Sequence, residues 1–332
     1  MIFALFLLSV IVTLLINPDT ATFIWTNATD ILGNPMYIFW LCSFSVFMFS
    51  GCVEDVEKLS ETMEKMAYTT IGLNLLHYVV ALAKNHYPEY MTFSYNILFS
   101  TTLMIILTMQ RFSWPRAIAG VVGAVLIFIA GCRGALVGLL VSVFAYDLLG
   151  RKHRTIKWMI SRAMLAGLAV LLVINWNMML MLVASLLESL DISSRTIYML
   201  LEENILDDSG RSALQNKIWQ EMTVLGHGLY ADRITLDGTY AHNILLELLF
   251  DYGILFGSVL SVLWISVIIT GVMKSSMEYR HLICALLSVG CIKLFLSGSF
   301  LNQEPGVYLL LGLCMNGLVV KKDNCKRKGS VY

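Results

Sequence analysis

The sequence from Gly238 to Gly253 reads Gly-Thr-Tyr-Ala-His-Asn-Ile-Leu-Leu-Glu-Leu-Leu-Phe-Asp-Tyr-Gly. It closes a long polar segment and opens an apolar one, a pattern typical of a chain that passes from water into a membrane. Upstream of it lie Gly210-Arg211-Ser212, Trp219 and Gly226-His227-Gly228, in the most polar part of the sequence. Apolar runs dominate the rest, so we expect membrane helices that hold this polar loop over the bilayer.

The composition is that of an integral membrane protein. Of the 332 residues, 58% are hydrophobic and only 14% are charged, whereas soluble domains contain about 25% charged residues. Apolar runs recur along the whole sequence, which favours a single membrane domain covering residues 1–332. The net charge of +0 gives no reason to expect a nucleic-acid partner. The seven cysteines include no C-x-x-C pair, and we expect neither a metal site nor a cofactor.

The apolar runs predict an all-α fold, a polytopic bundle of about ten transmembrane helices. Lys and Arg gather in alternate connections, with five between residues 151 and 162 and five after residue 320. The positive-inside rule therefore places both termini in the cytoplasm and segment 187–242, between the seventh and eighth spans, outside it. The predicted spans are 1–17, 36–53, 69–84, 91–109, 117–132, 134–149, 163–186, 253–273, 282–297 and 306–320.

The extracytoplasmic loop 187–242 is too long for a plain connection, and we expect local structure in it. Apolar residues at helical spacing predict a short interfacial helix from Gly210 to Met222. Gly226-His227-Gly228 and Asp237-Gly238 predict turns. Asn243, which ends the polar segment, fits the N-cap of the following helix.

Three residues are the main candidates for chemistry. His242 is the best candidate for a general base, because imidazole titrates near neutral pH, although a hydrogen-bonded interfacial histidine is an equal alternative. Arg211 follows a glycine and precedes a predicted helix, where it could bind a phosphate or remain a solvated loop charge. Arg133 lies in a tight turn between two spans, where it could bind an anion or reach lipid phosphates.

Six further residues could support such a site. Asn243 and Glu247 are four positions apart and therefore share one face of a helix. On a regular helix Glu247 lies about 140° around from His242, so it is not expected to orient that histidine directly. His227 could equally be a turn residue, and Lys293 could extend to the membrane interface. The six residues are Asn243, Glu247, Arg195, Arg233, His227 and Lys293.

The ordered set of these pieces resembles the O-antigen polymerase and O-antigen ligase superfamily of bacterial surface-polysaccharide enzymes. The resemblance covers roughly residues 115–320, and the first 110 residues match only as generic spans. The matching pieces are Cys132-Arg133-Gly134-Ala135, Gly210-Arg211-Ser212 with Trp219, Gly226-His227-Gly228, Tyr240-Ala241-His242-Asn243 with Leu246-Glu247, and Tyr252-Gly253.

The resemblance implies a metal-independent, membrane-embedded glycosyltransferase with an undecaprenyl-diphosphate-linked oligosaccharide as donor. Arg133 and Arg211 would bind the diphosphate, with Arg195 or Arg233 as further candidates, and His242 would activate or position the acceptor hydroxyl. We expect a polymerase that makes O-antigen or capsular polysaccharide at the outer face of the bacterial cytoplasmic (inner) membrane. Membrane lipids and a chain-length regulator protein are the expected partners.

Three alternatives remain open. An O-antigen ligase would use the same donor but transfer the glycan to lipid A-core, and the short chain slightly favours the polymerase. A lipid-linked oligosaccharide flippase would place polar groups at the bilayer midplane, often in repeated halves. The sequence shows no internal repeat, and its polar residues gather in the external loop. The last alternative is a non-catalytic anchoring protein.

Overall fold

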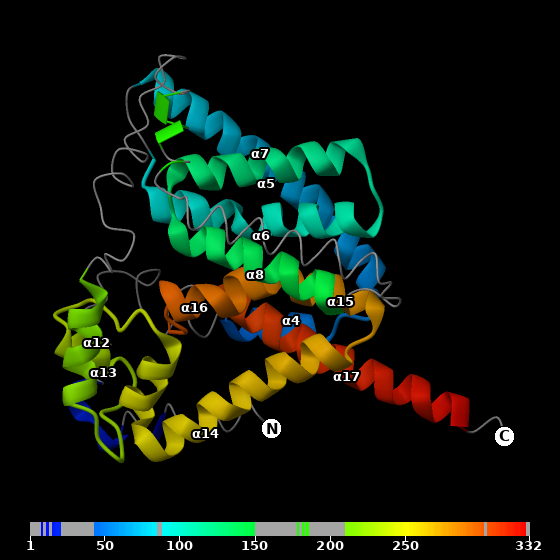
Figure 1. The fold of residues 1–332 in the computed structure, drawn as a ribbon. Coiled ribbons are helices and arrows are strands. Elements are labelled where there is room, and N and C mark those ends of the chain that lie inside the picture. The colour runs from blue at the N-terminus through cyan, green and yellow to red at the C-terminus, as the bar shows by residue number, and fades with distance from the viewer. Residues whose placement is uncertain are drawn as a thin grey trace. The chain divides into compact units, whose positions relative to one another are not determined.

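The computed structural model describes residues 43–84, 88–149, 210–301 and 304–329, with isolated positions in 8–20 and 178–185. Every regular element in these ranges is a helix, which confirms the all-α prediction there (Figure 1). Most of the predicted spans 1–17 and 163–186 and residues 187–209 of the loop lie outside the described residues. The chain forms two units, Met1–Glu64 with Ser209–Tyr332, and Lys65–Asp208.

The second unit, Lys65–Asp208, is built on helix α6, which packs against α7 and α8. Helix α7 ends at Gly131, whose left-handed backbone (φ 76°) turns the chain sharply. Helix α8 then begins at Arg133, so the predicted tight turn between these two spans is confirmed. The helices are α5 (Val56–Ala83, which begins in the first unit), α6 (Tyr90–Gln110), α7 (Trp114–Ala130) and α8 (Arg133–Leu149).

The first unit contains the loop and the C-terminal helices. Helix α17 packs against α4, α14 and α15, and helices α12 and α13 contact α14 near its start (Figure 1). A π-helical turn, Ser288–Ile292, joins α15 to α16. The helices are α4 (Ser45–Gly51), α12 (Arg211–Gln220), α13 (Ala231–Thr235), α14 (Ile244–Lys274), α15 (Met277–Leu287), α16 (Lys293–Leu296) and α17 (Pro305–Gly329).

Among the described residues, four helices are long and apolar enough to cross a membrane. They are α5, α6, α14 and the continuous stretch Met277–Leu296. Helix α7 and the Pro305–Gly317 part of α17 are apolar but shorter. These helices are consistent with a membrane protein, while the count of about ten spans and the sides of the termini stay predictions.

Helix α14 breaks at Gly253, whose φ of 81° and ψ of 162° lie in a region that almost only glycine adopts. The break takes helical partners away from backbone groups, and buried groups of this kind need hydrogen bonds from elsewhere. Loop residues 223–228 supply them. The bonds run from His227 N to Phe250 O (3.0 Å), Gly228 N to Asp251 O (2.9 Å) and Ile254 N to Thr223 O (3.0 Å).

The predicted turn at Gly226-His227-Gly228 is therefore wrong. The stretch lies alongside the break in α14, because its amides bond the carbonyls that the helix leaves free. A turn follows directly, at residues 229–230. The predicted turn at Asp237-Gly238 is confirmed, and both of its residues have positive φ.

Gly226 and Gly253 meet backbone to backbone at this junction. A methyl group on Gly253 would overlap the Val224 carbonyl oxygen, and one on Gly226 would overlap the Gly253 amide. Both residues also have a φ of +81°. Only glycine satisfies the backbone angle and the close approach together, so the loop and α14 are joined by a contact that no other residue permits.

We expect Gly253→Ala to lower the free energy of unfolding by at least about 2 kcal/mol, because backbone strain and steric overlap act together. Thermal unfolding of the purified protein in detergent measures the loss. Gly210→Ala is the matched control, since Gly210 has a φ of +80° but nothing within 4 Å of the added carbon. Equal losses in the two variants would show that the backbone contact contributes nothing.

Candidate functional site

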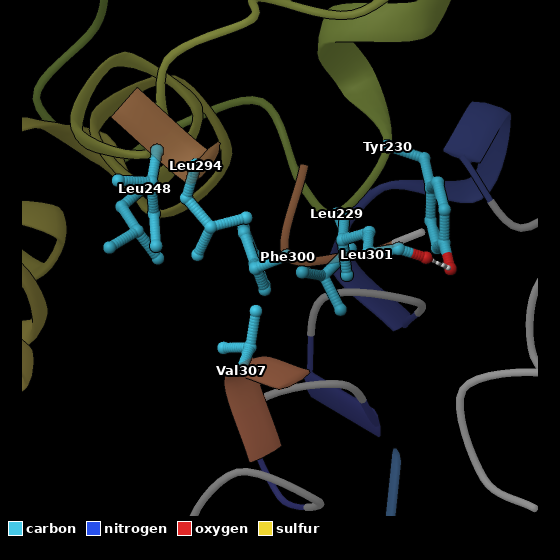
Figure 2. Packing of buried hydrophobic residues seen from close by; sticks show 8 residues of the cluster. Leu229, Tyr230, Leu248, Leu294, Phe300, Leu301 and Val307 are labelled. Atoms are coloured by element: carbon cyan, nitrogen blue, oxygen red, sulfur yellow. Dashed lines mark hydrogen bonds between the residues drawn. The ribbon is translucent and has the colours of Figure 1, made fainter. Parts of the chain in front are cut away.

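A buried apolar cluster fixes the chain between α16 and α17. Figure 2 shows its packing, with the Tyr230 hydroxyl directed at the Leu301 carbonyl (3.4 Å). Every member is at most 7% exposed, and burying a large apolar side chain contributes about 1.5–3 kcal/mol. The cluster thereby holds residues 300–301 against the loop and α14. Its members are Leu229, Tyr230, Ile244, Leu248, Leu294, Phe300, Leu301 and Val307.

Residues 296–299, here called the acceptor segment, offer backbone carbonyls to the loop. Arg211 Nη1 donates a hydrogen bond to the Leu296 carbonyl (2.5 Å). The Tyr240 hydroxyl donates to the Ser297 carbonyl (2.9 Å). Two side chains from different parts of the loop therefore converge on one short stretch of backbone.

Arg211 lies where the sequence predicted it, at the start of a helix that follows a glycine. Gly210 has a left-handed backbone (φ 80°) and α12 begins at Arg211. The buried Ile218 of α12 packs with Phe250 of α14, which fixes the helix to the unit. Beyond its bond to the Leu296 carbonyl, the half-buried guanidinium has no hydrogen-bond partner among the described residues, so N–H groups remain to bind an anion.

His242 is held in a strained conformation beside the acceptor segment. Its φ of 53° is in the left-handed region, which costs a non-glycine residue about 1–3 kcal/mol and is typical of functional positions. Its ring lies 4.1 Å from the Tyr240 ring, centroid to centroid. Its Nδ1 lies 3.4 Å from the Ser297 carbonyl oxygen. Because a carbonyl only accepts, Nδ1 carries the proton and Nε2 is left with a free lone pair.

The environment of His242 favours the neutral imidazole. Burial lowers its pKa from the ordinary 6.5, and the positive charge of Arg211 lowers it further, while the bond to the Ser297 carbonyl acts in the opposite direction. The net effect is a lowered pKa, so the ring is mostly neutral at pH 7. A neutral ring with a free Nε2 is the form that can accept a proton from a substrate.

Asn243 caps helix α14, as predicted. Its side-chain oxygen accepts hydrogen bonds from the Leu245 amide (3.0 Å) and the Leu246 amide (3.4 Å). A cap of this kind contributes about 1 kcal/mol. The role of Asn243 is to fix the start of the helix directly after His242, and through it the position of that histidine.

Asp232, Arg233, Glu247 and Asp251 form what we call the buried ionic cluster. Arg233 Nη1 lies 2.8 Å from Asp232 Oδ1 and 3.3 Å from Glu247 Oε1. Arg233 Nη2 donates to the Ser299 hydroxyl (2.6 Å), which in turn donates to Glu247 Oε1. The cluster therefore reaches the acceptor segment through Ser299.

Arg233 keeps its charge although it is only 7% exposed. Burial lowers its pKa, but the carboxylates of Asp232 and Glu247 outweigh burial and hold the pKa above its ordinary value. The guanidinium also lies over the rings of Tyr230 (4.9 Å) and Tyr240 (5.5 Å). It is thus enclosed by carboxylates and aromatic faces, an arrangement that fixes it in place.

The structure brings five of the predicted site residues together in the first unit. Arg211 and His242 contact backbone carbonyls of the acceptor segment. Arg233 and Glu247 bond the Ser299 hydroxyl of the same segment, and Asn243 caps α14. Glu247 bonds Arg233 and Ser299, as expected of a residue that does not orient His242 directly.

The other predicted residues have different surroundings. His227 stacks on Phe250 (4.5 Å between centroids), and its Nε2 lies 2.7 Å from the Glu221 carbonyl oxygen. Lys293 forms an ion pair with Glu304 (2.6 Å), and its reach to the membrane interface stays a prediction. Burial raises the pKa of Glu304, and Lys293 counteracts that shift in part.

The structure does not relate two predicted arginines to His242. Arg133 is the first residue of α8 and belongs to the second unit, so its role in the same site stays a prediction. Arg195 lies outside the described residues.

Sequence reasoning missed Asp232 and Asp251. A signal for Asp251 was available. It is an ionisable residue inside an apolar stretch, which indicates a functional site, and it lies four residues after Glu247 and so shares its helix face. Asp232 had no such signal, since it is one of several acids in a polar loop. The acceptor segment could not be found either, because its carbonyls belong to the backbone.

The arrangement combines a neutral base with a cation on a rigid support, which suits proton removal beside an anionic group. No protein-family model matches this chain, and comparisons with curated proteins and with solved structures find no match either.

Proposed function

We propose that the protein is a membrane glycosyltransferase that polymerises undecaprenyl-diphosphate-linked oligosaccharide repeat units into O-antigen or capsular polysaccharide. The observation that carries the proposal is the convergence of His242 and Arg211 on the acceptor segment, residues 296–299. The apolar helices suit a donor with a polyprenyl tail. The resemblance to the polymerase and ligase superfamily supports the choice of donor.

The proposed reaction uses these side chains directly. A sugar hydroxyl attacks the anomeric carbon of the donor, and the carbon–oxygen bond to the diphosphate breaks. His242 Nε2 takes the hydroxyl proton, since Nδ1 is already protonated toward the Ser297 carbonyl. Undecaprenyl diphosphate leaves with the bonding electrons, and Arg211 stabilises its growing charge. Arg133 is a second diphosphate ligand in this proposal, and the reaction takes place at the outer face of the bacterial cytoplasmic membrane.

The test is electrophoresis of surface glycan and of undecaprenyl-linked glycan from cells that lack the gene, with and without rescue by the wild-type protein. Polymerase activity predicts single repeat units on the lipid anchor and a ladder that rescue restores. Long chains left on undecaprenyl diphosphate would indicate a ligase. Single units trapped at the cytoplasmic face would indicate a flippase and would refute the proposal.

We expect Arg211→Lys to reduce polymer formation by about 10-fold or more, because an ammonium group cannot offer the paired N–H groups of a guanidinium. The rate is measured with lipid-linked repeat units and purified protein. Arg111→Lys is the matched control, since Arg111 is exposed between α6 and α7. If Arg211→Lys were as active as this control, Arg211 would not bind the diphosphate through a guanidinium and would be only a charged residue of the loop.

We also expect the rate of polymer formation to depend on the protonation of His242. The lowered pKa of His242 implies a midpoint below 6.5. The rate should be constant around neutral pH and should fall as the pH decreases through the midpoint, because the protonated ring cannot act as a base. Initial rates from about pH 5 to pH 8 test this. A midpoint above 6.5 would contradict the role of burial.

A further inference from the structure

The buried ionic cluster contains more negative than positive charge. Asp232, Glu247 and Asp251 are each at most 3% exposed, and Arg233 is the cation that the structure pairs with them. With all carboxylates ionised, three negative charges face one positive charge. An uncompensated excess of charge in a protein interior is strongly unfavourable. Within the described part of the chain Arg233 is the cation paired with the cluster, so protons or a bound cation would have to neutralise the remaining charge.

The Asp251 carboxylate lacks hydrogen-bond partners among the described residues, which points to a ligand. Both of its carboxylate oxygens are buried, and neither has a hydrogen-bond partner among the described residues. The Tyr230 backbone amide lies near this carboxylate without meeting the geometry of a hydrogen bond. Buried polar atoms without a partner are rare in folded proteins. The described residues therefore supply no partner for Asp251, and a bound cation would be one.

The other two carboxylates also keep acceptor capacity. Oδ1 of Asp232 and Oε1 of Glu247 each accept two hydrogen bonds, whereas Oδ2 of Asp232 and Oε2 of Glu247 accept one each. A carboxylate oxygen has two lone-pair directions. Each of the two residues can therefore bind a cation through its second oxygen without losing its bond to Arg233.

The spacing of the three carboxylates fits a single ion. One oxygen from each of Asp232, Glu247 and Asp251 lies within 4.8 Å of the others. Two oxygens on opposite sides of an ion lie about 4.8 Å apart around Ca²⁺ and about 4.1 Å apart around Mg²⁺. We propose that these residues bind a hard divalent cation, Ca²⁺ or Mg²⁺. Its two charges would bring the cluster to neutrality, and an all-oxygen ligand set is what these ions prefer.

The ion would be structural. It would connect Asp232 on α13 to Glu247 and Asp251, which lie on α14 before its break at Gly253. It would thus fix the loop to the helix next to residues 299–300, which Glu247 already bonds. The inference does not depend on the proposed transfer reaction, because no part of it involves His242 or the glycan.

The experiment uses the full-length protein in detergent, depleted of metal with EDTA. The melting temperature is then measured with added Ca²⁺, Mg²⁺ or Mn²⁺, and the bound metal by mass spectrometry. We expect the wild-type protein to bind a single ion per chain and to gain roughly 5 °C. Asp251→Asn should lose both effects. In EDTA this variant should melt at or above the wild-type temperature, because it removes one uncompensated charge.

Asp237→Asn is the matched control, an exposed acid of the same loop that should keep the full response. A wild-type protein that binds no metal and gains no stability overturns the proposal, whether or not Asp251→Asn folds. A response that persists in Asp251→Asn would place the ion elsewhere, for example on anionic lipid, and also overturns it. A melting temperature in EDTA that rises at acidic pH, with no response to metal, would show that protons neutralise the cluster and would likewise overturn the proposal.

Discussion

His242→Asn is expected to lower the rate of polymer formation by at least about 100-fold. Asparagine tolerates the left-handed backbone found at His242 (φ 53°). Its amide can also donate to the Ser297 carbonyl as Nδ1 does, but it has no group that accepts a proton near neutral pH. The variant therefore keeps the local structure and removes the base. The measurement is the rate with lipid-linked repeat units and equal amounts of purified protein.

The control for this prediction is His77→Asn. His77 is an exposed histidine of α5 that contacts the Phe93 ring, and its replacement should leave the rate within about twofold. Melting temperatures of both variants show whether the fold is kept. A His242→Asn protein that retains most of its activity would remove His242 from the reaction and leave the histidine as a structural residue.

Arg233→Met is expected to destabilise the protein by about 3–5 kcal/mol, because it leaves buried carboxylates without their cation. Methionine matches the length of the arginine stem, so the loss reflects charge and hydrogen bonding more than packing. Arg233 contacts Asp232, Glu247 and Ser299. Thermal and denaturant unfolding of the purified protein measure the loss.

A double variant tests the reason for this loss. Glu247→Gln removes one of the stranded charges, so Arg233→Met with Glu247→Gln should be less destabilised than the sum of the single variants. Arg111→Met is the control at an exposed arginine and should change stability by less than about 0.5 kcal/mol. Additive effects of the two buried substitutions would mean that the Arg233 to Glu247 contact is not a source of stability.

Much of the fold could be predicted from apolar runs and local signals. Three such features depend only on residues that are neighbours in the sequence. They are the hairpin at Gly131, the helix after Gly210 and the cap at Asn243. The predicted span 253–273 begins at Gly253, where α14 breaks. The helix itself begins earlier, at Ile244, because Asn243 caps it there, and the turns before the break include two buried acids.

The parts that could not be predicted depend on contacts between distant residues. The residue types of Gly226-His227-Gly228 are typical of a turn. Two of their amides instead donate hydrogen bonds to carbonyls that the break in α14 leaves free. The ion pair of Lys293 with Glu304 could not be predicted either, because the two residues are eleven positions apart and meet only in the folded chain. Arg233 appeared as one loop charge among several, and only its burial with Asp232 and Glu247 shows its importance.

The acceptor segment has a consequence for the order in which the protein is made. The carbonyls that hold Arg211 and His242 come 85 and 55 residues later in the chain. The polar loop therefore leaves the ribosome well before the backbone that positions it. A chain that stops ahead of residue 296 carries Arg211 and His242 but lacks the carbonyls that hold them. Formation of the site thus waits until residues 296–299 have been synthesised.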